Sequence, residues 1–494
     1  MRGVRADYPT TPLINVHPMR LRISILSAIL SLPLHAQSAV AIRNATVIDG
    51  TGAPPRPGYT VVVRGGRIVA VGPVGSTRIP PGARVLNGSG QFVLPGFIDV
   101  HAHYDLGPTR MDTTPTGVVM RVTPDHDGGM ESLRTLLAFG VTTIRNPAGH
   151  AATTVAIRDS VRLGLVPGPR ILTAGEAIDG IAAVDGLSIV VKTEQQARDE
   201  VDRQAALGVD YVKLYAGLGP TYVRAAIDQA HRKGIRAIGH LFLTSWTDAA
   251  NAGIDGIVHI TPGSPLLLRP DKRVEFQRRF RGTQFMLEWF NFVDPQSAEI
   301  QAMLEALRTH RVFVDPTLVT FEAMAWGDST RITESPDLAY APPSIVRSWH
   351  SFALSAGWKP EDFAEAGRAW PHVLEYTKLL YDAGVPLTAG TDMSNPWTVP
   401  GASFHRELQL LSAAGIPNLE VLRIATRNGA WSLGLETEIG SVAVGKVADL
   451  VVLTGDPVQD IQNTRRIAYV VQGGVVSTPE ALLPPTVRAR VHAR

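Results

Sequence analysis

The sequence contains no cysteine, so the chain can form neither a disulfide bond nor a cysteine nucleophile. Any metal site must therefore use histidine, carboxylate or modified lysine side chains. The absence of cysteine also fits an oxidising compartment. An excess of one charge is lacking as well, because 47 Lys and Arg stand against 45 Asp and Glu. This balance does not point to a nucleic acid or an anionic surface as a partner.

Long apolar runs are absent apart from one short run near the N-terminus. The basic segment 19–22 (Met-Arg-Leu-Arg) precedes an apolar run from Ile23 to Leu34, and small residues surround Ala36. This pattern is typical of a secretory signal peptide, with translation starting at Met19 and cleavage near Ala36. The alternative is a membrane anchor, but the run is too short to span a bilayer comfortably. We expect a periplasmic or secreted protein without a membrane span after cleavage.

Short β-runs broken by Gly and Pro occur at both ends of the long chain, in residues 40–93 and 440–476. We interpret them as the two parts of one small β-sandwich, with a larger domain inserted between them. Internal repeats and low-complexity tracts are not evident. The expected organisation is an N-terminal extension and signal peptide (1–39), the first β part (40–94), the inserted domain (95–434), the second β part (435–480) and a C-terminal tail (481–494).

The inserted domain alternates β-runs with helical segments such as Thr193–Leu207, Pro220–Lys233 and Asp294–Thr309. Eight such units predict an α/β fold of the TIM (β/α)8 barrel type, in which catalytic residues lie at the C-terminal ends of the strands. The predicted strands are Gly96–His101, Val141–Asn146, Arg170–Ala174, Tyr211–Tyr215, Arg236–His240, Gly256–Ile260, Val312–Pro316 and Pro386–Thr391. The longest excursions, 262–300 and 320–370, contain several Trp and Phe residues and form either a lid or pocket wall or ordinary surface insertions.

Polar residues follow these predicted strands at their ends. His101 and His103 end the first strand at positions i and i+2, so both side chains point to one face and can coordinate one metal ion. Burying an unpaired Lys or Asp in an apolar strand is costly, so each needs a partner, which a metal cluster would supply. The remaining candidates are Lys213 on strand four, His240 on strand five, His259 on strand six and Asp392 after strand eight.

This ordered set of six residues resembles the ligand set of the amidohydrolase superfamily. The resemblance covers nearly the whole mature chain, including the split β domain, and is greatest to the imidazolonepropionase-like and prolidase-like members with a strand-four lysine. It implies two divalent metal ions, usually zinc, bridged by a carboxylated Lys213. By the same resemblance, His101, His103 and Asp392 would hold the more buried metal, and His240 and His259 the more exposed one. The alternatives to metal binding are that the histidines are buried core residues and that Lys213 pairs with Asp392 without carboxylation.

The implied chemistry is amide hydrolysis by a metal-bridging hydroxide. A buried Lys213 would have a lowered pKa and could take up carbon dioxide. Two metals about 3.5–4 Å apart can acidify a bridging water and polarise a carbonyl. Asp392 can take the proton and pass it to the leaving amine. Tyr215 lies at i+2 from Lys213 and could hydrogen-bond the carbonyl oxygen, unless it is only a packed aromatic residue.

Other polar residues near the predicted barrel loops are not assigned to the metal site. His405 and Glu407 start a probable helix, where we expect a structural role, and His150 also lies in a barrel loop. Arg145-Asn146 ends strand two, where relatives often have an acidic residue after the Arg, and is interpreted as a scaffold variation. A substrate carboxylate could be bound by one of four arginines, which the sequence does not rank: Arg110, Arg121, Arg269 and Arg273.

The expected protein is therefore an exported binuclear amidohydrolase acting on a peptide-like or N-acyl amino acid small-molecule substrate. A cyclic-amide hydrolase of the imidazolonepropionase or hydantoinase kind, or an esterase or lactonase on the same site, stays open. Deaminases of the superfamily generally lack the bridging lysine. A non-catalytic binding protein is disfavoured because all six ligands are present. The oligomeric state is open, although the aromatic-rich insertions could bury the surface of a second copy.

Overall fold

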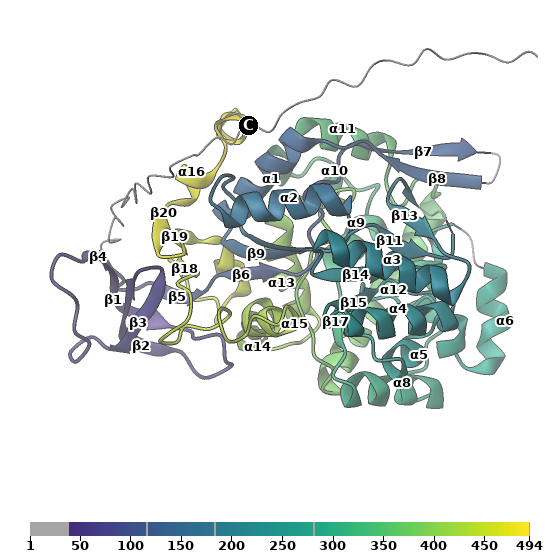
Figure 1. Ribbon diagram of the computed structural model, residues 1–494, viewed down its shortest axis with the longest axis horizontal. Coiled ribbons are helices and arrows are strands. Elements are labelled where there is room, and N and C mark those ends of the chain that lie inside the picture. The colour runs from purple at the N-terminus through teal and green to yellow at the C-terminus, as the bar shows by residue number, and fades with distance from the viewer. Residues whose placement is uncertain (1–38, 115–116, 182–183, 280–281, 494) are drawn as a thin grey trace, which may run out of the picture. The chain divides into compact units, whose positions relative to one another are not determined.

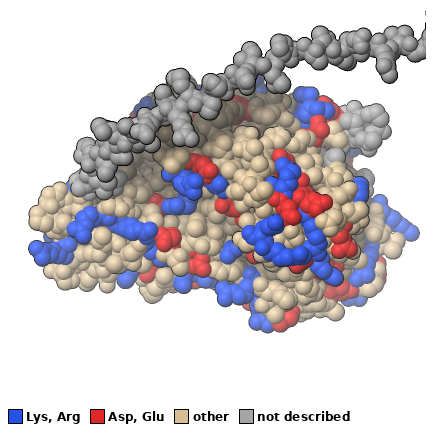
Figure 2. Space-filling view, viewed as in Figure 1, with Lys and Arg blue, Asp and Glu red and all other residues tan. Residues whose placement is uncertain are grey.

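The computed structural model describes residues 39–493 except for 115–116, 182–183 and 280–281. The proposed signal peptide lies outside these residues. Figure 2 shows that positive and negative side chains are interspersed over the face in view. Within the described ranges, every helix falls short of the length or apolarity that a membrane span requires.

Both ends of the described chain contribute to one eight-stranded sheet, in which the strand order is β20-β19-β18-β5-β1-β2-β3 and β4 pairs with β1. Figure 1 shows the purple β1–β5 beside the yellow β18–β20. Buried Val, Ile and Leu side chains from both ends form its core. The strands are β1 (Val40–Val47), β2 (Arg56–Arg64), β3 (Arg67–Pro73), β4 (Arg84–Asn87), β5 (Phe92–Pro95), β18 (Leu450–Leu453), β19 (Ile467–Gln472) and β20 (Val475–Ser477).

The inserted part contains two parallel sheets, of order β10-β9-β6 and β13-β11-β14-β15-β16-β17. A single bridge from Ala174 to Tyr211 joins these two ladders, and another from Val314 to Leu387 connects the second ladder with the eighth predicted segment. The strands are β6 (Phe97–Asp99), β9 (Val141–Asn146), β10 (Arg170–Thr173), β11 (Ala177–Asp179), β13 (Ser188–Val190), β14 (Tyr211–Leu214), β15 (Arg236–Gly239), β16 (Gly256–Val258) and β17 (Phe313–Asp315). The predicted TIM-barrel type of fold with a small β domain is confirmed, whereas the residue boundaries of the domains stay a prediction.

The predicted eighth strand, Pro386–Thr391, differs from the prediction. It forms no continuous ladder and is held by isolated contacts, including the bridge at Leu387 and a hydrogen bond from Val100 N to Ala389 O. Pro386 has no N–H to donate, and the Thr391 hydroxyl donates to the buried carboxylate of Asp99 at 2.7 Å. Side-chain hydrogen bonds to residues distant in the sequence therefore replace part of the backbone ladder of the eighth strand.

Three helices of the barrel, α3 (Glu194–Leu207), α4 (Pro220–Arg232) and α8 (Ala298–Thr309), lie within the helical segments predicted for them. Helix α3 begins after Thr193, whose side chain accepts a hydrogen bond from Gln196 N, and ends at Gly208, whose φ of 90° favours glycine. The other helices of the barrel and of the C-terminal region are α1 (His126–Ala138), α2 (Ala151–Arg162), α5 (Trp246–Asn251), α12 (Pro360–Asp382), α13 (Ala402–Ala413), α14 (Asn418–Arg423), α15 (Gly429–Ser432), α16 (Pro479–Leu482) and α17 (Pro485–His492).

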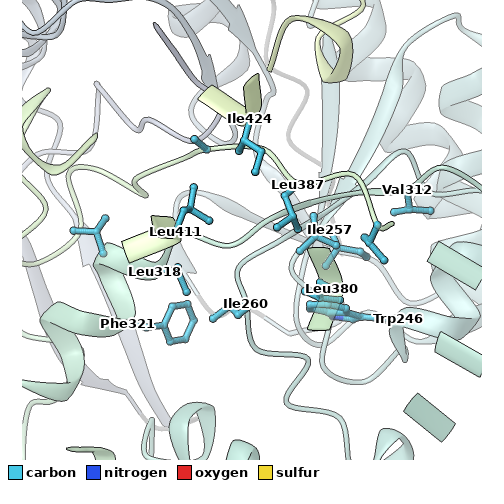
Figure 3. Packing of buried hydrophobic residues seen from close by; sticks show 14 of the residues in the cluster. Trp246, Ile257, Ile260, Val312, Leu318, Phe321, Leu380, Leu387, Leu411 and Ile424 are labelled. Carbon is cyan, nitrogen blue, oxygen red and sulfur yellow. The ribbon is translucent and has the colours of Figure 1, made fainter. Parts of the chain in front are cut away.

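The core lies between these helices and the parallel strands. Figure 3 shows four side chains of this core, which are Ile257 of β16, Leu380 of α12, Trp246 of α5 and Leu387. All four side chains are buried. The segment predicted as a tail contains α17, where Val487 is buried and Arg490 pairs with Glu131.

The two long excursions fold into short helices, which are α6 (Pro270–Arg279), α7 (Phe285–Glu288), α9 (Leu318–Ala325), α10 (Thr330–Thr333) and α11 (Pro343–Ser351). Met286, Phe321, Met324 and Leu354 from these segments line a cavity at the barrel mouth. These four residues therefore form a pocket wall, as one of the two sequence interpretations expected.

Candidate active site

The six residues predicted as metal ligands line one cavity of about 140 Å³ at the C-terminal ends of the barrel strands. His101 and His103 follow β6, Lys213 lies on β14, and His240 and His259 follow β15 and β16. Asp392 follows the irregular eighth segment. Lys213 is 2% exposed and Asp392 is 6% exposed, so both charged groups are withdrawn from solvent. The fold thus brings together all six residues.

Asp392 lies between the histidines. Its Oδ1 atom is 3.2 Å from the Nε2 atoms of both His101 and His103, and its Oδ2 atom is 4.0 Å from Nδ1 of His259. Ligand atoms of His101, His259 and Asp392 lie within 4.8 Å of one another. The ring of His240 is 4.5 Å from that of His259. This arrangement can hold a metal ion, whereas the division of ligands between two metals stays a prediction.

Burial keeps these histidines in the form that binds metal. It lowers the pKa of His240 to about 3, and it lowers the pKa values of His101 and His259 as well, with the charge of Lys213 acting in the same direction. The imidazoles are therefore neutral at neutral pH. The Nε2 atoms of His101 and His240 are buried and make no hydrogen bond in the described structure. Unused imidazole nitrogens aimed into a polar cluster fit a metal site.

Lys213 has the environment that carboxylation requires. Burial lowers the pKa of its amine to about 7, an effect that the nearby carboxylate of Asp392 opposes. About half of the amine is then uncharged at neutral pH, and only the uncharged amine is nucleophilic. Lys213 lines the same cavity as the histidines and Asp392.

Asp315 at the end of β17 is a site residue that the sequence analysis missed. Its Oδ2 atom accepts a hydrogen bond from Nδ1 of His101 at 3.0 Å, and both side chains are fully buried. Such a bond fixes the orientation of a ligand imidazole. The signal was available, because a buried Asp in an apolar strand is the same feature that identified Lys213.

Arg145 completes this buried network. Its guanidinium lies 3.6 Å from Asp315, and its Cζ atom is 5.4 Å and 5.2 Å from the ring centroids of Tyr211 and Phe313. The side chain is fully buried, so its charge is compensated by Asp315 and the two aromatic faces. The neighbouring Asn146 donates to Asp105 at 3.1 Å.

Three residues at the site adopt a positive φ although none is glycine. These are His259 (71°), Thr317 (49°) and Asp392 (56°). The hydroxyl of Thr317 lies 2.8 Å from Nδ1 of His259. Non-glycine residues in this region are strained and cluster at functional sites. Local sequence gave no signal for Thr317.

Tyr215 lines the cavity beside the histidines, with its ring centroid 5.0 Å from that of His240. Burial raises the pKa of its hydroxyl, and the charge of Asp392 raises it further. The hydroxyl therefore stays protonated at neutral pH and can donate a hydrogen bond.

The remaining candidates lie apart from this cavity. His405 is buried, with its ring nitrogens 3.0 Å from Thr464 Oγ1 and Phe139 O, and Glu407 accepts from Val319 N at 2.8 Å. Both contacts agree with the structural roles expected. His150 is 3.7 Å from Glu176 and lines a neighbouring cavity. The four arginines considered for a substrate carboxylate, Arg110, Arg121, Arg269 and Arg273, all pair with carboxylates and are not among the described residues that line the histidine cavity.

Comparisons with known proteins agree with this geometry. Two models of the amidohydrolase family match residues 92–278 and 361–477. An imidazolonepropionase of Symbiobacterium thermophilum is 24% identical over 410 residues, covering 81% of this chain and 84% of the relative. Among solved structures, a Xaa-Pro dipeptidase with bound methionine matches with a TM-score of 0.66 at 19% identity, over 89% of this chain and 100% of the other. Bottromycin amidohydrolase matches with a TM-score of 0.69 at 22% identity, over 92% of this chain and 90% of the other.

The matched residues contain the histidine cluster, Lys213 and Asp392, which are the groups that the fold gathers at the barrel mouth. Members of this family are metal-dependent enzymes that hydrolyse carbon–nitrogen bonds. The chain belongs to the amidohydrolase superfamily and is a metal-dependent hydrolase of carbon–nitrogen bonds.

Proposed function

We propose that this protein is a binuclear-metal hydrolase that cleaves an amide bond in a peptide-like or N-acyl amino acid substrate. The observation that carries the proposal is Lys213, a buried amine whose pKa is lowered to about 7 and which lines the same cavity as four histidines and Asp392. Carboxylation of this amine would convert it into a bidentate anionic ligand. His101, His103 and Asp392 would hold one metal, His240 and His259 the other, and Lys213 would bridge them.

When bound, two divalent ions, for which zinc suits the histidine ligands, would lower the pKa of a water molecule and polarise the substrate carbonyl. Asp392 accepts the proton of the attacking water on a carboxylate oxygen and passes it to the nitrogen of the leaving amine. The Tyr215 hydroxyl donates a hydrogen bond to the carbonyl oxygen as negative charge develops there. Asp315 holds the His101 ring in place through its Nδ1 atom.

The apolar side chains of the cavity wall favour a substrate with an apolar group beside the scissile bond. Met286, Phe321 and Leu354 line the same cavity as the histidines. Burying apolar surface against them contributes about 25 cal/mol per Å² to binding. The likeness to a Xaa-Pro dipeptidase supports a peptide-like substrate.

A cyclic amide is the second candidate substrate, because the imidazolonepropionase matches 81% of this chain. Both candidates are tested with one panel of dipeptides, N-acyl amino acids and cyclic imides, assayed with zinc and bicarbonate and again after chelation. We expect hydrolysis of a linear amide, its loss on chelation and its return with zinc. Activity on cyclic imides alone would replace the linear substrate, and hydrolysis that survives chelation would contradict the metal mechanism.

We also propose that the protein is exported through the segment near Ile23–Leu34, on the basis of its basic start, apolar core and small-residue exit. Fusion of residues 1–39 to a reporter that is active only outside the cytoplasm tests this proposal. A reporter that stays inactive would contradict it.

A further inference from the structure

A second cavity of about 430 Å³ adjoins the histidine cavity. The loop after β6 separates the two, with His103 lining the first cavity and Asp105 lining the second. Leu106 and Leu187 line both cavities. The two cavities therefore meet at these two leucines, beside the wall that the loop forms.

The hairpin β7 (Thr109–Thr114) and β8 (Gly117–Val122) supplies another part of this wall, because β8 pairs in parallel with β12 (Val184–Asp185). Met120 is opposite Val184, and both line the first cavity. Arg121 is opposite Asp185, and both line the second. Successive side chains point to opposite faces of a strand, so the two faces of this small sheet serve different cavities.

Several charged side chains that line the second cavity have partners within the chain. Arg121 Nη1 is 2.6 Å from Asp185 Oδ2, and Arg110 Nε is 2.9 Å from Asp112 Oδ1. Asp125 accepts hydrogen bonds from Gly128 N at 2.9 Å and from the Ser344 hydroxyl at 2.6 Å. A free carboxylate or ammonium group on a ligand would have to compete with these pairs. The cavity therefore suits an uncharged polar chain.

Apolar side chains interrupt the polar lining. Val122, Met130 and Ile157 lie among the charged residues. A peptide segment matches this mixture, because its amide groups alternate with apolar side chains. A long fatty acyl chain would displace water from Arg121 and Asp185 without offering them hydrogen bonds in return, and is disfavoured.

We propose that the second cavity binds the part of a peptide substrate that lies away from the scissile amide, with Leu106 and Leu187 contacting the chain between the two cavities. The inference rests on the proposed function, and it makes the substrate an uncharged peptide segment longer than a dipeptide. The residue next to the cleaved bond occupies the apolar first cavity.

The test compares two substitutions on α2. Thr153 is exposed and lines the second cavity, whereas the neighbouring Ala152 is exposed and lies outside the linings of both cavities. Thr153→Trp fills the second cavity, and Ala152→Trp is the matched control. The probes are Leu-Leu and this dipeptide extended by Ser-Gly at either end, with the added end blocked as a C-terminal amide or an N-acetyl group, assayed with the zinc-loaded enzyme.

We expect the wild-type enzyme to cleave at least one extended peptide with a higher kcat/KM than Leu-Leu. Thr153→Trp should lower kcat/KM for that peptide about tenfold and leave Leu-Leu within about twofold. Ala152→Trp should change neither value. Equal losses for both peptides in Thr153→Trp, or no preference in the wild type, would overturn the inference.

Calorimetric binding separates this inference from the proposed function. The ligand is the extended peptide with its scissile amide replaced by a methyleneamine. Affinity lost only in Thr153→Trp supports the second cavity even if none of the peptides is hydrolysed. Unchanged affinity in that variant overturns the inference even if hydrolysis occurs.

Discussion

The Nδ1 atom of His101 lies 3.0 Å from Oδ2 of Asp315, and both side chains are inaccessible to solvent. A neutral imidazole that donates from Nδ1 keeps a lone pair on Nε2. That Nε2 atom lies 3.2 Å from Asp392 Oδ1, inside the candidate metal cluster. When ionised, Asp315 favours the tautomer in which Nε2 of His101 can bind a metal.

Replacing Asp315 with Asn keeps its size and removes its charge. We expect zinc affinity to fall about 10- to 100-fold, as for other partners that orient metal-binding histidines. Competition with a chromophoric chelator measures the affinity. Asp255→Asn is the control, since Asp255 also pairs with a histidine, His231 at 2.9 Å, but lies outside the cavity. Equal affinities in the two variants would remove Asp315 from the site.

Removing the hydroxyl of Tyr215 tests its contact with the substrate carbonyl. Tyr215→Phe should lower kcat by about 10²–10³, the usual effect of losing one oxyanion donor, with the metal content unchanged. Tyr222→Phe is the control, because the Tyr222 hydroxyl bonds the Lys192 carbonyl oxygen at 2.8 Å outside the cavity. Unchanged turnover in Tyr215→Phe would mean that the ring only packs beside His240.

His405 makes the stability of the fold depend on pH. Burial lowers the pKa of this histidine from 6.5 to about 3, so the folded state keeps it neutral while the unfolded chain takes up a proton below pH 6.5. Its contribution is complete above pH 6.5 and is lost as the pH falls towards 3. The slope is about 1.4 kcal/mol per pH unit.

The comparison with His405→Gln isolates this contribution. Between pH 7 and pH 5, the wild-type free energy of unfolding should fall by about 2 kcal/mol more than that of the variant. Urea unfolding at the two pH values measures both. Parallel losses in the two proteins would show that His405 is not held neutral by the fold.

The sequence predicted a shared site for charged residues that are costly to bury. Lys213 and Asp392 interrupt apolar strand sequences, and a charge there needs partners, so their convergence on one cavity could be predicted. Asp315 carries the same signal and was overlooked. The eighth strand was predicted as regular, but the bond from Thr391 to Asp99 depends on contacts almost 300 residues apart.

The second cavity could not be predicted for a related reason. It depends on the pairing of Met120 with Val184 and of Arg121 with Asp185, and nothing local in either segment indicates the other. Thr317 likewise gives no sequence signal, because its positive φ follows from the packing around His259.

The most direct measurement of the central claim is the number of metal ions per chain in the wild type and in Lys213→Ala, both purified with zinc and bicarbonate. Lys233→Ala is the control, since Lys233 is an exposed residue that pairs with Asp202. We predict two metals per chain in the wild type and the control, and loss of one or both in Lys213→Ala together with hydrolysis. A single metal that is retained without Lys213 would contradict the bridging lysine and the binuclear mechanism.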